Sequence, residues 1–239
     1  MGNDSKFFKQ FESTIILTNN NNKPAAIIFD LDGTLLDTIA DIGNSVNDIL
    51  KEFNYEQRSI KFYRDNVGGG IIDLLKKALP NDHGRPIDIY IDPLDRFYRL
   101  NLNKSAKVFP NIYDILDELK NRDIPIAVIS NKPHEFAVEC VKEFLSEHID
   151  ITIGSGDKYA LKPDPESANH VLDIFNVDPK QCFFVGDSGF DIITARNAGM
   201  KSIGVLWGLS NEERLLKFDP DYLFNEPSDL LKFVKNFAI

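Results

Sequence analysis

Six short apolar segments restrict the fold of this chain more than any other feature of its sequence. Each has the length of a β-strand, and most are apolar at consecutive positions instead of alternating with polar residues. Continuous apolar runs of this length are typical of strands buried on both faces, as in a parallel sheet. The segments are residues 25–29, 125–129, 150–153, 182–185, 202–206 and 222–224.

Helical patterns separate most of these segments. Apolar residues recur at helical spacing, for example at residues 112–119. The pair Asp164-Pro165 predicts a helix start, with Asp164 as the N-cap and Pro165 in the first turn. Gly199 is predicted to end a helix that begins near Ser188. Strands and helices that alternate in this way predict an α/β fold, a doubly wound Rossmann-like parallel sheet.

Residues 38–107 interrupt this alternation with helical patterns alone. The apolar stripe from Ile39 to Phe53 has helical periodicity, and Thr38 followed by Asp41 resembles a capping box at its start. No convincing strand follows within the segment. We therefore predict three parts in the chain: a flexible leader at residues 1–24, an α/β core formed by residues 25–37 and 108–239, and a small inserted α-helical cap at residues 38–107.

The net charge and the cysteine content argue against several classes of function. With 27 Lys and Arg against 37 Asp and Glu, the chain has a formal net charge of −10, whereas nucleic-acid binding depends on positive charge. No apolar run approaches the roughly 20 residues that span a bilayer, and the leader has no signal-peptide pattern. Cys140 and Cys182 cannot form a disulfide framework and indicate a reducing compartment. We expect a cytoplasmic protein with neither nucleic acid nor membrane as its partner; the sequence predicts no oligomeric state.

Two carboxylates follow the first predicted strand directly, in the segment Asp30-Leu31-Asp32-Gly33-Thr34. Open α/β sheets bind their ligands at the edge where such strands end. A turn is the simpler interpretation, because Asp and Gly favour turns. A calcium loop is excluded, since it needs Gly at its sixth position and Glu at its twelfth, where the chain has Leu35 and Asp41. Together with the motifs that follow, the segment favours catalytic roles for Asp30 and Asp32.

A second pair of carboxylates follows another apolar strand, in Gly186-Asp187-Ser188-Gly189-Phe190-Asp191. Asp187 and Asp191 are four residues apart, so a helix that starts here places both on one face. Neighbouring carboxylates repel each other unless a cation lies between them, which favours a metal site. The alternative is an N-cap aspartate followed by an exposed one.

Two further segments have groups suited to a phosphate. Ser130-Asn131-Lys132-Pro133 ends the second core strand, where a hydroxyl group and backbone amides can hold a phosphate. Lys162 stands in Lys162-Pro163-Asp164-Pro165 and would supply a fixed positive charge, although most lysines are solvated surface residues.

These four segments, in this order, resemble the motifs of the haloacid dehalogenase-like hydrolase superfamily from residue 25 to the last residue. The resemblance implies that Asp30 is the nucleophile and Asp32 the general acid and base. It implies Mg²⁺ held by the carboxylates of Asp30 and Asp187 and by the backbone carbonyl of Asp32, with Asp191 among the ligands or just behind them. The phosphate would be held by Thr34, Ser130, Asn131 and Lys162.

Part of the predicted cap resembles the cap loop of phosphoglycolate phosphatases and implies substrate contacts from Arg64, Gly68, Gly69 and Gly70. The glycines can instead serve as a hinge for cap closure. We predict a magnesium-dependent phosphatase for a small phosphorylated metabolite, 2-phosphoglycolate. Inorganic pyrophosphatase and other sugar-phosphate phosphatase or phosphomutase activities of the superfamily are the alternatives. A non-catalytic scaffold protein is disfavoured, because the four aspartates of the motifs are intact.

Overall fold

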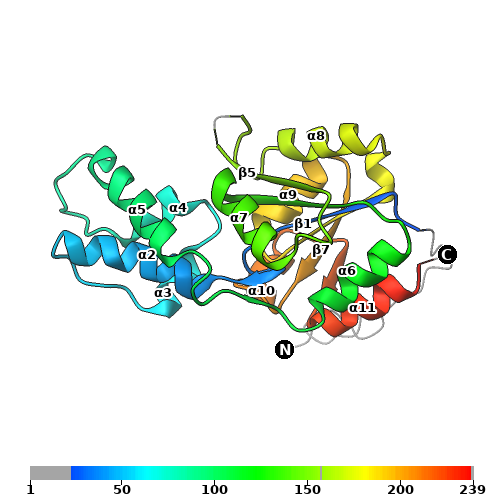
Figure 1. Cartoon of the computed structure of the whole chain (residues 1–239), viewed down its shortest axis with the longest axis horizontal. Helices are drawn as coiled ribbons and strands as arrows, with labels where there is room; N and C mark the ends of the chain where they lie inside the picture. The colour runs from blue at the N-terminus through cyan, green and yellow to red at the C-terminus, as the bar shows by residue number, and fades with distance from the viewer. Residues whose placement is uncertain (1–22, 157, 238–239) are drawn as a thin grey trace, which may run out of the picture.

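A computed structural model describes residues 23–156 and 158–237 of the chain, so the predicted leader lies almost entirely outside the described residues. A six-stranded sheet lies between two layers of helices (Figure 1). All paired strands in it are parallel, in the order β5-β4-β1-β6-β7-β8. This confirms the predicted doubly wound α/β fold. The strands are β1 (Ala26–Phe29), β4 (Ile126–Pro133), β5 (Ile151–Ser155), β6 (Cys182–Gly186), β7 (Lys201–Val205) and β8 (Tyr222–Phe224).

The two faces of the sheet bury alternate side chains of each strand. In β1, Ile27 and Phe29 belong to one hydrophobic core, while Ala26 and Ile28 belong to the other. Side chains alternate between the faces of a strand, which is why a strand between two helical layers is apolar at every position. The first core includes α6 (Ile112–Asn121), α7 (His134–Phe144) and α11 (Pro227–Lys235); the second includes α8 (Glu166–Phe175) and α9 (Gly189–Asn197).

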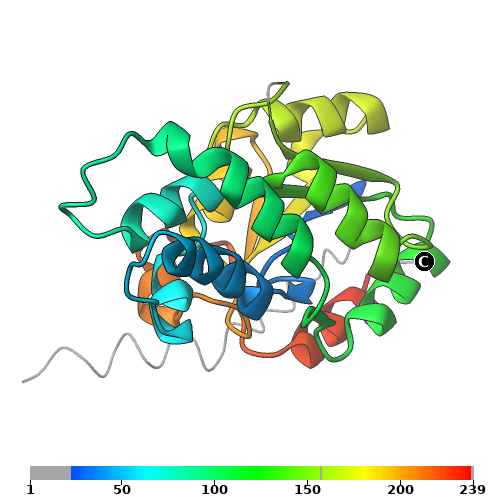
Figure 2. The same ribbon diagram turned by 60° about the vertical axis from the view of Figure 1, so that its left-hand side comes forward.

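Helices of the insertion form a group of their own beside the sheet, seen on the left in Figure 1 and turned forward in Figure 2. They are α2 (Ile39–Glu52), α3 (Ile60–Asn66), α4 (Ile71–Ala78), the 3₁₀ turn η1 (Ile87–Tyr90) and α5 (Ile91–Asn101). Their apolar stripes meet in a third hydrophobic core, which Phe136 of α7 joins. This separate core supports the proposed division into cap and α/β core. None of the helices in the described part of the chain is long and apolar enough to cross a membrane.

Two short strands connect the insertion to the rest of the chain, and the sequence did not predict them. Strands β2 (Leu36–Asp37) and β3 (Lys107–Val108) pair antiparallel, with Leu36 opposite Val108 and Asp37 opposite Lys107. The expectation of helices alone through residue 107 is therefore wrong at its last position. Strands of two residues carry no periodic pattern, so only the pairing of the two crossings reveals them.

The capping box predicted at Thr38 and Asp41 is wrong. Thr38 is the N-cap residue of α2, but its hydroxyl group makes no capping bond and donates to Asp32 Oδ1 at 2.6 Å. The Asp41 carboxylate accepts hydrogen bonds from the backbone amides of Ser105 and Ala106, at 2.8 and 3.1 Å. Both side chains are therefore used between distant parts of the chain instead of within the helix.

The ends of two core helices test the other local predictions. Helix α8 begins at Glu166 with Pro165 as its N-cap, so the prediction of Asp164 at that position is wrong. The Asp164 carboxylate still accepts a hydrogen bond from the Glu166 amide, at 2.9 Å. Helix α9 begins directly after Ser188, and Gly199 follows its end in the left-handed conformation, with φ +73°, as predicted.

Candidate active site

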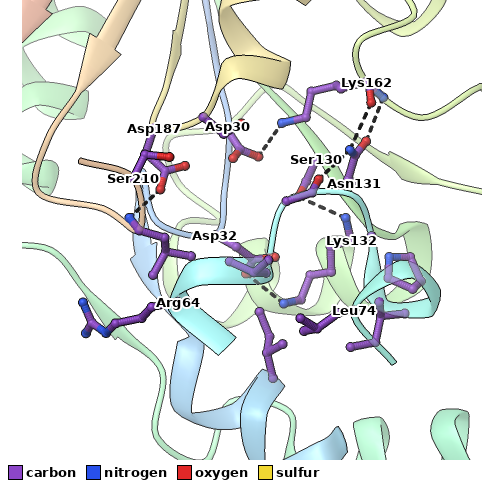
Figure 3. Close-up of a pocket in the computed structure, with 18 of the residues that line it drawn as sticks. Asp30, Asp32, Arg64, Leu74, Ser130, Asn131, Lys132, Lys162, Asp187 and Ser210 are labelled. Carbon is purple, nitrogen blue, oxygen red and sulfur yellow. Dashed lines mark hydrogen bonds and ion pairs between the residues drawn. The ribbon is translucent and has the colours of Figure 1, made fainter. Parts of the chain in front are cut away.

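Four of the sequence motifs meet at the carboxyl ends of neighbouring strands. Asp30 follows β1, Ser130 lies in the last part of β4, Lys162 stands in the loop after β5, and Asp187 follows β6. These four strands are adjacent in the sheet. Their side chains line one cavity between the sheet edge and the cap (Figure 3). The parallel topology thus joins residues that are far apart in the sequence.

A buried ammonium group links two of the aspartates. Lys162 Nζ lies 2.7 Å from Asp30 Oδ1 and 2.6 Å from Asp191 Oδ1, and it also donates to the Ile129 carbonyl at 3.1 Å. Burial disfavours the charge of Lys162, but the two carboxylates outweigh burial and raise its pKa above the ordinary value. The ammonium is therefore a fixed positive charge at the floor of the cavity.

Burial lowers the pKa of a lysine, but it raises the pKa of an aspartate. It raises the pKa of Asp30 to about 7, although Lys162 opposes this shift. Burial, with the neighbouring charges of Asp30 and Asp191, also raises the pKa of Asp187 well above its ordinary value. A nearby cation would stabilise the ionised form of these buried carboxylates and so lower their raised pKa.

The buried acidic cluster could hold a metal ion. Asp30, Asp187 and Asp191 can each place one carboxylate oxygen within 4.8 Å of the others. Among the described residues, Lys162 is the one ammonium paired with this cluster, through Asp30 and Asp191, so two negative charges stay uncompensated when all three carboxylates are ionised. Oxygen ligands with that excess charge suit a hard divalent cation.

The three carboxylates differ in how many of their oxygens already accept hydrogen bonds from the protein. Asp191 Oδ1 accepts from Lys162, and its Oδ2 accepts from the amide and hydroxyl groups of Ser188, at 3.0 and 2.6 Å. Asp187 Oδ2 accepts from the Leu209 amide at 2.6 Å. Both oxygens of Asp191 are thus occupied, which favours the second of its two predicted places, just behind the metal ligands instead of among them.

Two glycines allow the close approach of backbone to Asp187. A Cβ atom at Gly33 would lie 2.4 Å from Asp187 Oδ2, and one at Gly208 would lie 2.4 Å from the same oxygen and 2.2 Å from the Gly33 carbonyl oxygen. Gly33 also has φ +89°, a backbone conformation that residues other than glycine rarely adopt. These positions therefore have no room for a larger residue while Asp187 keeps its place.

Residues 27–205 match the haloacid dehalogenase-like hydrolase family, which is more than half of the chain. The chain belongs to the haloacid dehalogenase-like hydrolases. It is 32% identical to a phosphoglycolate phosphatase of Mannheimia succiniciproducens over 90% of this chain and 100% of the relative. It is 33% identical to one of Aquifex aeolicus, over 89% and 98%. The crystal structure of a predicted phosphoglycolate phosphatase from Haemophilus somnus superposes with a TM-score of 0.78 and 28% identity, covering 87% of this chain and 96% of that one.

The prediction of an enzyme of this hydrolase family is thereby confirmed. The four residues predicted to contact phosphate differ from one another in their position relative to the cavity. Ser130 and Lys162 line the cavity. Asn131 also lines it, but its side chain already binds protein: Oδ1 accepts from the Lys162 amide at 2.7 Å, and Nδ2 donates to the carbonyls of Gly68 and Lys162. Thr34 is fully buried outside the lining, and its hydroxyl group has no partner among the described residues. Its contact with phosphate stays a prediction.

The predicted cap residues of this hydrolase lie at or near the cavity. Arg64, Gly68 and Gly70 line it, together with Arg214 of α10 (Glu212–Leu216), whereas Gly69 does not. A Cβ atom at Gly68 would lie 3.3 Å from the Phe190 ring, so the glycine loop contacts the α/β core closely.

Besides Arg214, sequence reasoning missed Lys132, which contacts a predicted catalytic aspartate. Its side chain is 1% exposed, and its Nζ lies 2.9 Å from Asp32 Oδ1. Strand β4 continues through Pro133. The register of β4 against β5 shifts between Ile129 and Pro133, so the alternation of a regular strand would not by itself have placed the Lys132 side chain.

Proposed function

We propose that this hydrolase cleaves a small phosphate monoester, 2-phosphoglycolate, in a magnesium-dependent reaction through a phosphoaspartyl intermediate. The observation that carries the proposal is the convergence of Asp30, Asp32 and Lys162 on one cavity beneath the cap. The names of the relatives support the choice of substrate. Two cysteines, both free and buried, support a cytoplasmic location.

Asp30 is the nucleophile of the proposed mechanism. Its Oδ1 pairs with Lys162, while its other oxygen accepts no hydrogen bond from the described residues and can attack phosphorus. The P–O bond to the leaving group then breaks, and Asp32 gives its proton to the departing oxygen. The phosphoryl group is now bound to Asp30.

The second half of the reaction restores the enzyme. A water molecule attacks phosphorus, Asp32 takes the proton of that water, and the bond between phosphorus and Asp30 breaks to release phosphate. Lys162 and the Ser130 hydroxyl group stabilise negative charge on the phosphoryl oxygens in both halves.

Magnesium would be held by the carboxylates of Asp30 and Asp187 and by the Asp32 carbonyl. When bound, it would supply the positive charge that screens the nucleophile from the phosphate anion. The three buried carboxylates with one ammonium among them support this assignment. Asp191 would act behind the ligands, by holding Lys162 in place.

The glycine loop beside Arg64 would recognise the carboxylate of 2-phosphoglycolate. Backbone amides at the start of α4 and the Arg64 guanidinium are donors for an anion at that end of the cavity. A Gly69→Val variant, compared on 2-phosphoglycolate and p-nitrophenyl phosphate, separates this role from that of a hinge.

A substrate panel with a nucleophile variant tests the proposal. Hydrolysis of 2-phosphoglycolate, p-nitrophenyl phosphate and inorganic pyrophosphate is measured with Mg²⁺ and with EDTA. We expect the highest kcat/KM for 2-phosphoglycolate, loss of activity in EDTA, and no activity in Asp30→Asn. Normal turnover by Asp30→Asn would refute the mechanism, while a preference for pyrophosphate would refute the substrate alone.

A further inference from the structure

Two donors hold one oxygen of Asp32. Its Oδ1 accepts from Lys132 Nζ at 2.9 Å and from the Thr38 hydroxyl group at 2.6 Å. Its Oδ2 accepts no hydrogen bond from the described residues, and Asp32 lines the cavity. The clamp on Oδ1 therefore leaves Oδ2 as the oxygen that can exchange a proton with a ligand.

Lys132 is itself confined from several directions. The side chain is 1% exposed, and its ammonium lies 5.2 Å from the ring centroid of Tyr98, which comes from helix α5 of the cap. The Tyr98 ring packs in turn on Phe136 of α7, at 4.7 Å between centroids. A cation enclosed by a carboxylate and an aromatic face cannot move to solvent without losing both contacts.

Burying a lysine to hold an aspartate is a costly arrangement if it serves the fold alone. A buried ion pair loses the hydration of both charges, and apolar residues of similar volume often stabilise a protein as well or better. Lys132 lies beside the cavity and contacts a carboxylate that the mechanism needs. Its position is thus better explained by the reaction than by folding.

We propose that Lys132 is a positioning residue for Asp32, holding its carboxylate in the pose from which Oδ2 removes the proton of the attacking water. This rests on the proposed function. The consequence falls on the second half-reaction, hydrolysis of the phosphoaspartyl group. The first half-reaction with p-nitrophenyl phosphate is much less affected, because p-nitrophenolate leaves without a proton.

Pre-steady-state kinetics of Lys132→Met with p-nitrophenyl phosphate and Mg²⁺ test this role. We expect a burst of p-nitrophenolate equal to the enzyme concentration, followed by a steady-state rate about 10-fold or more below that of the unmodified enzyme. Phosphorylated enzyme should accumulate in acid-quenched samples analysed by mass spectrometry. A merely structural defect would instead lower the active fraction, with a small burst and no accumulation, and that result would overturn the proposal.

Four further variants complete the test. Asp32→Asn should show the same burst, and Lys132→Met added to Asp32→Asn should slow turnover no further; multiplied losses would overturn the proposal. Lys132→Arg should restore part of the steady-state rate. Lys232→Met, at an exposed position of α11, should behave as the unmodified enzyme.

A readout that does not depend on turnover separates this inference from the proposed function. In a crystal structure of Lys132→Met, we expect the Asp32 carboxylate to leave the pose that it has beside Thr38. An unchanged carboxylate would overturn the role of Lys132 even if the enzyme is a phosphatase. A displaced carboxylate would support it even if p-nitrophenyl phosphate is not hydrolysed, in which case the proposed function is what fails.

Discussion

Replacing Lys162 by methionine removes the ammonium that two buried carboxylates share, while keeping a side chain of similar length. Lys162 is 4% exposed, and its partners Asp30 and Asp191 are 7% and 0% exposed, so solvent screens these contacts little. Removing one partner of a buried ion pair costs about 3–5 kcal/mol. For a protein of this size that corresponds to a fall in Tm of about 10 °C.

Thermal unfolding followed by circular dichroism in EDTA at pH 8 measures this loss. Adding Mg²⁺ should make the fall in Tm smaller, because the cation replaces some of the missing positive charge. Lower pH should also make the fall in Tm smaller, because Asp30 can then take up a proton. Lys232→Met is the control for loss of an exposed lysine. A Lys162→Met protein with the Tm of the unmodified enzyme in EDTA would refute the reasoning that buried carboxylates left without the ammonium destabilise the fold.

Three other outcomes are expected. Because the pKa of Asp30 is raised from 3.8 to about 7, the folded metal-free protein binds the Asp30 proton more tightly than the unfolded chain does. The stability of the metal-free protein should therefore fall as pH rises from about 4 to about 7. A series of Tm measurements in EDTA should show this trend, and Asp30→Asn should weaken it. Asp187→Ala should abolish both activity and the rise in Tm on adding Mg²⁺, and an unchanged magnesium affinity by calorimetry would contradict its role as a ligand. Gly69→Val, whose Cβ would lie 2.6 Å from Asp73 Oδ2, should lower kcat/KM for 2-phosphoglycolate more than for p-nitrophenyl phosphate if the loop binds the carboxylate, whereas equal losses would indicate a hinge.

The strand-end residues were predictable from the sequence for a simple geometric reason. Asp30 and Asp187 each follow a continuous apolar strand, and in a parallel sheet the carboxyl ends of all strands lie at one edge. Helices of the insertion were equally predictable, because the stripe from Ile39 to Phe53 repeats at helical spacing over several turns. In both cases the information lies in neighbouring residues.

Roles of individual polar side chains were not predictable in this way. Thr38 and Asp41 have the spacing of a capping box, yet Thr38 donates to Asp32 and Asp41 binds the amides of Ser105 and Ala106. The stronger partners are brought from more than 60 residues away along the chain in the case of Asp41. Local sequence patterns cannot predict a hydrogen-bond partner that comes close to the side chain only in the folded chain.

The sequence by itself determined the α/β architecture, the helical insertion and the placement of the acidic motifs at strand ends, because each depends on periodicity or on residues adjacent in the chain. Tertiary structure alone decided that Lys132 is buried against Asp32 and Tyr98, and that Asn131 binds the cap loop and the Lys162 segment. A lysine or an asparagine beside a strand end has the same local pattern whether it faces solvent or a partner. Its burial is fixed by the elements that pack around it, which come from distant parts of the chain.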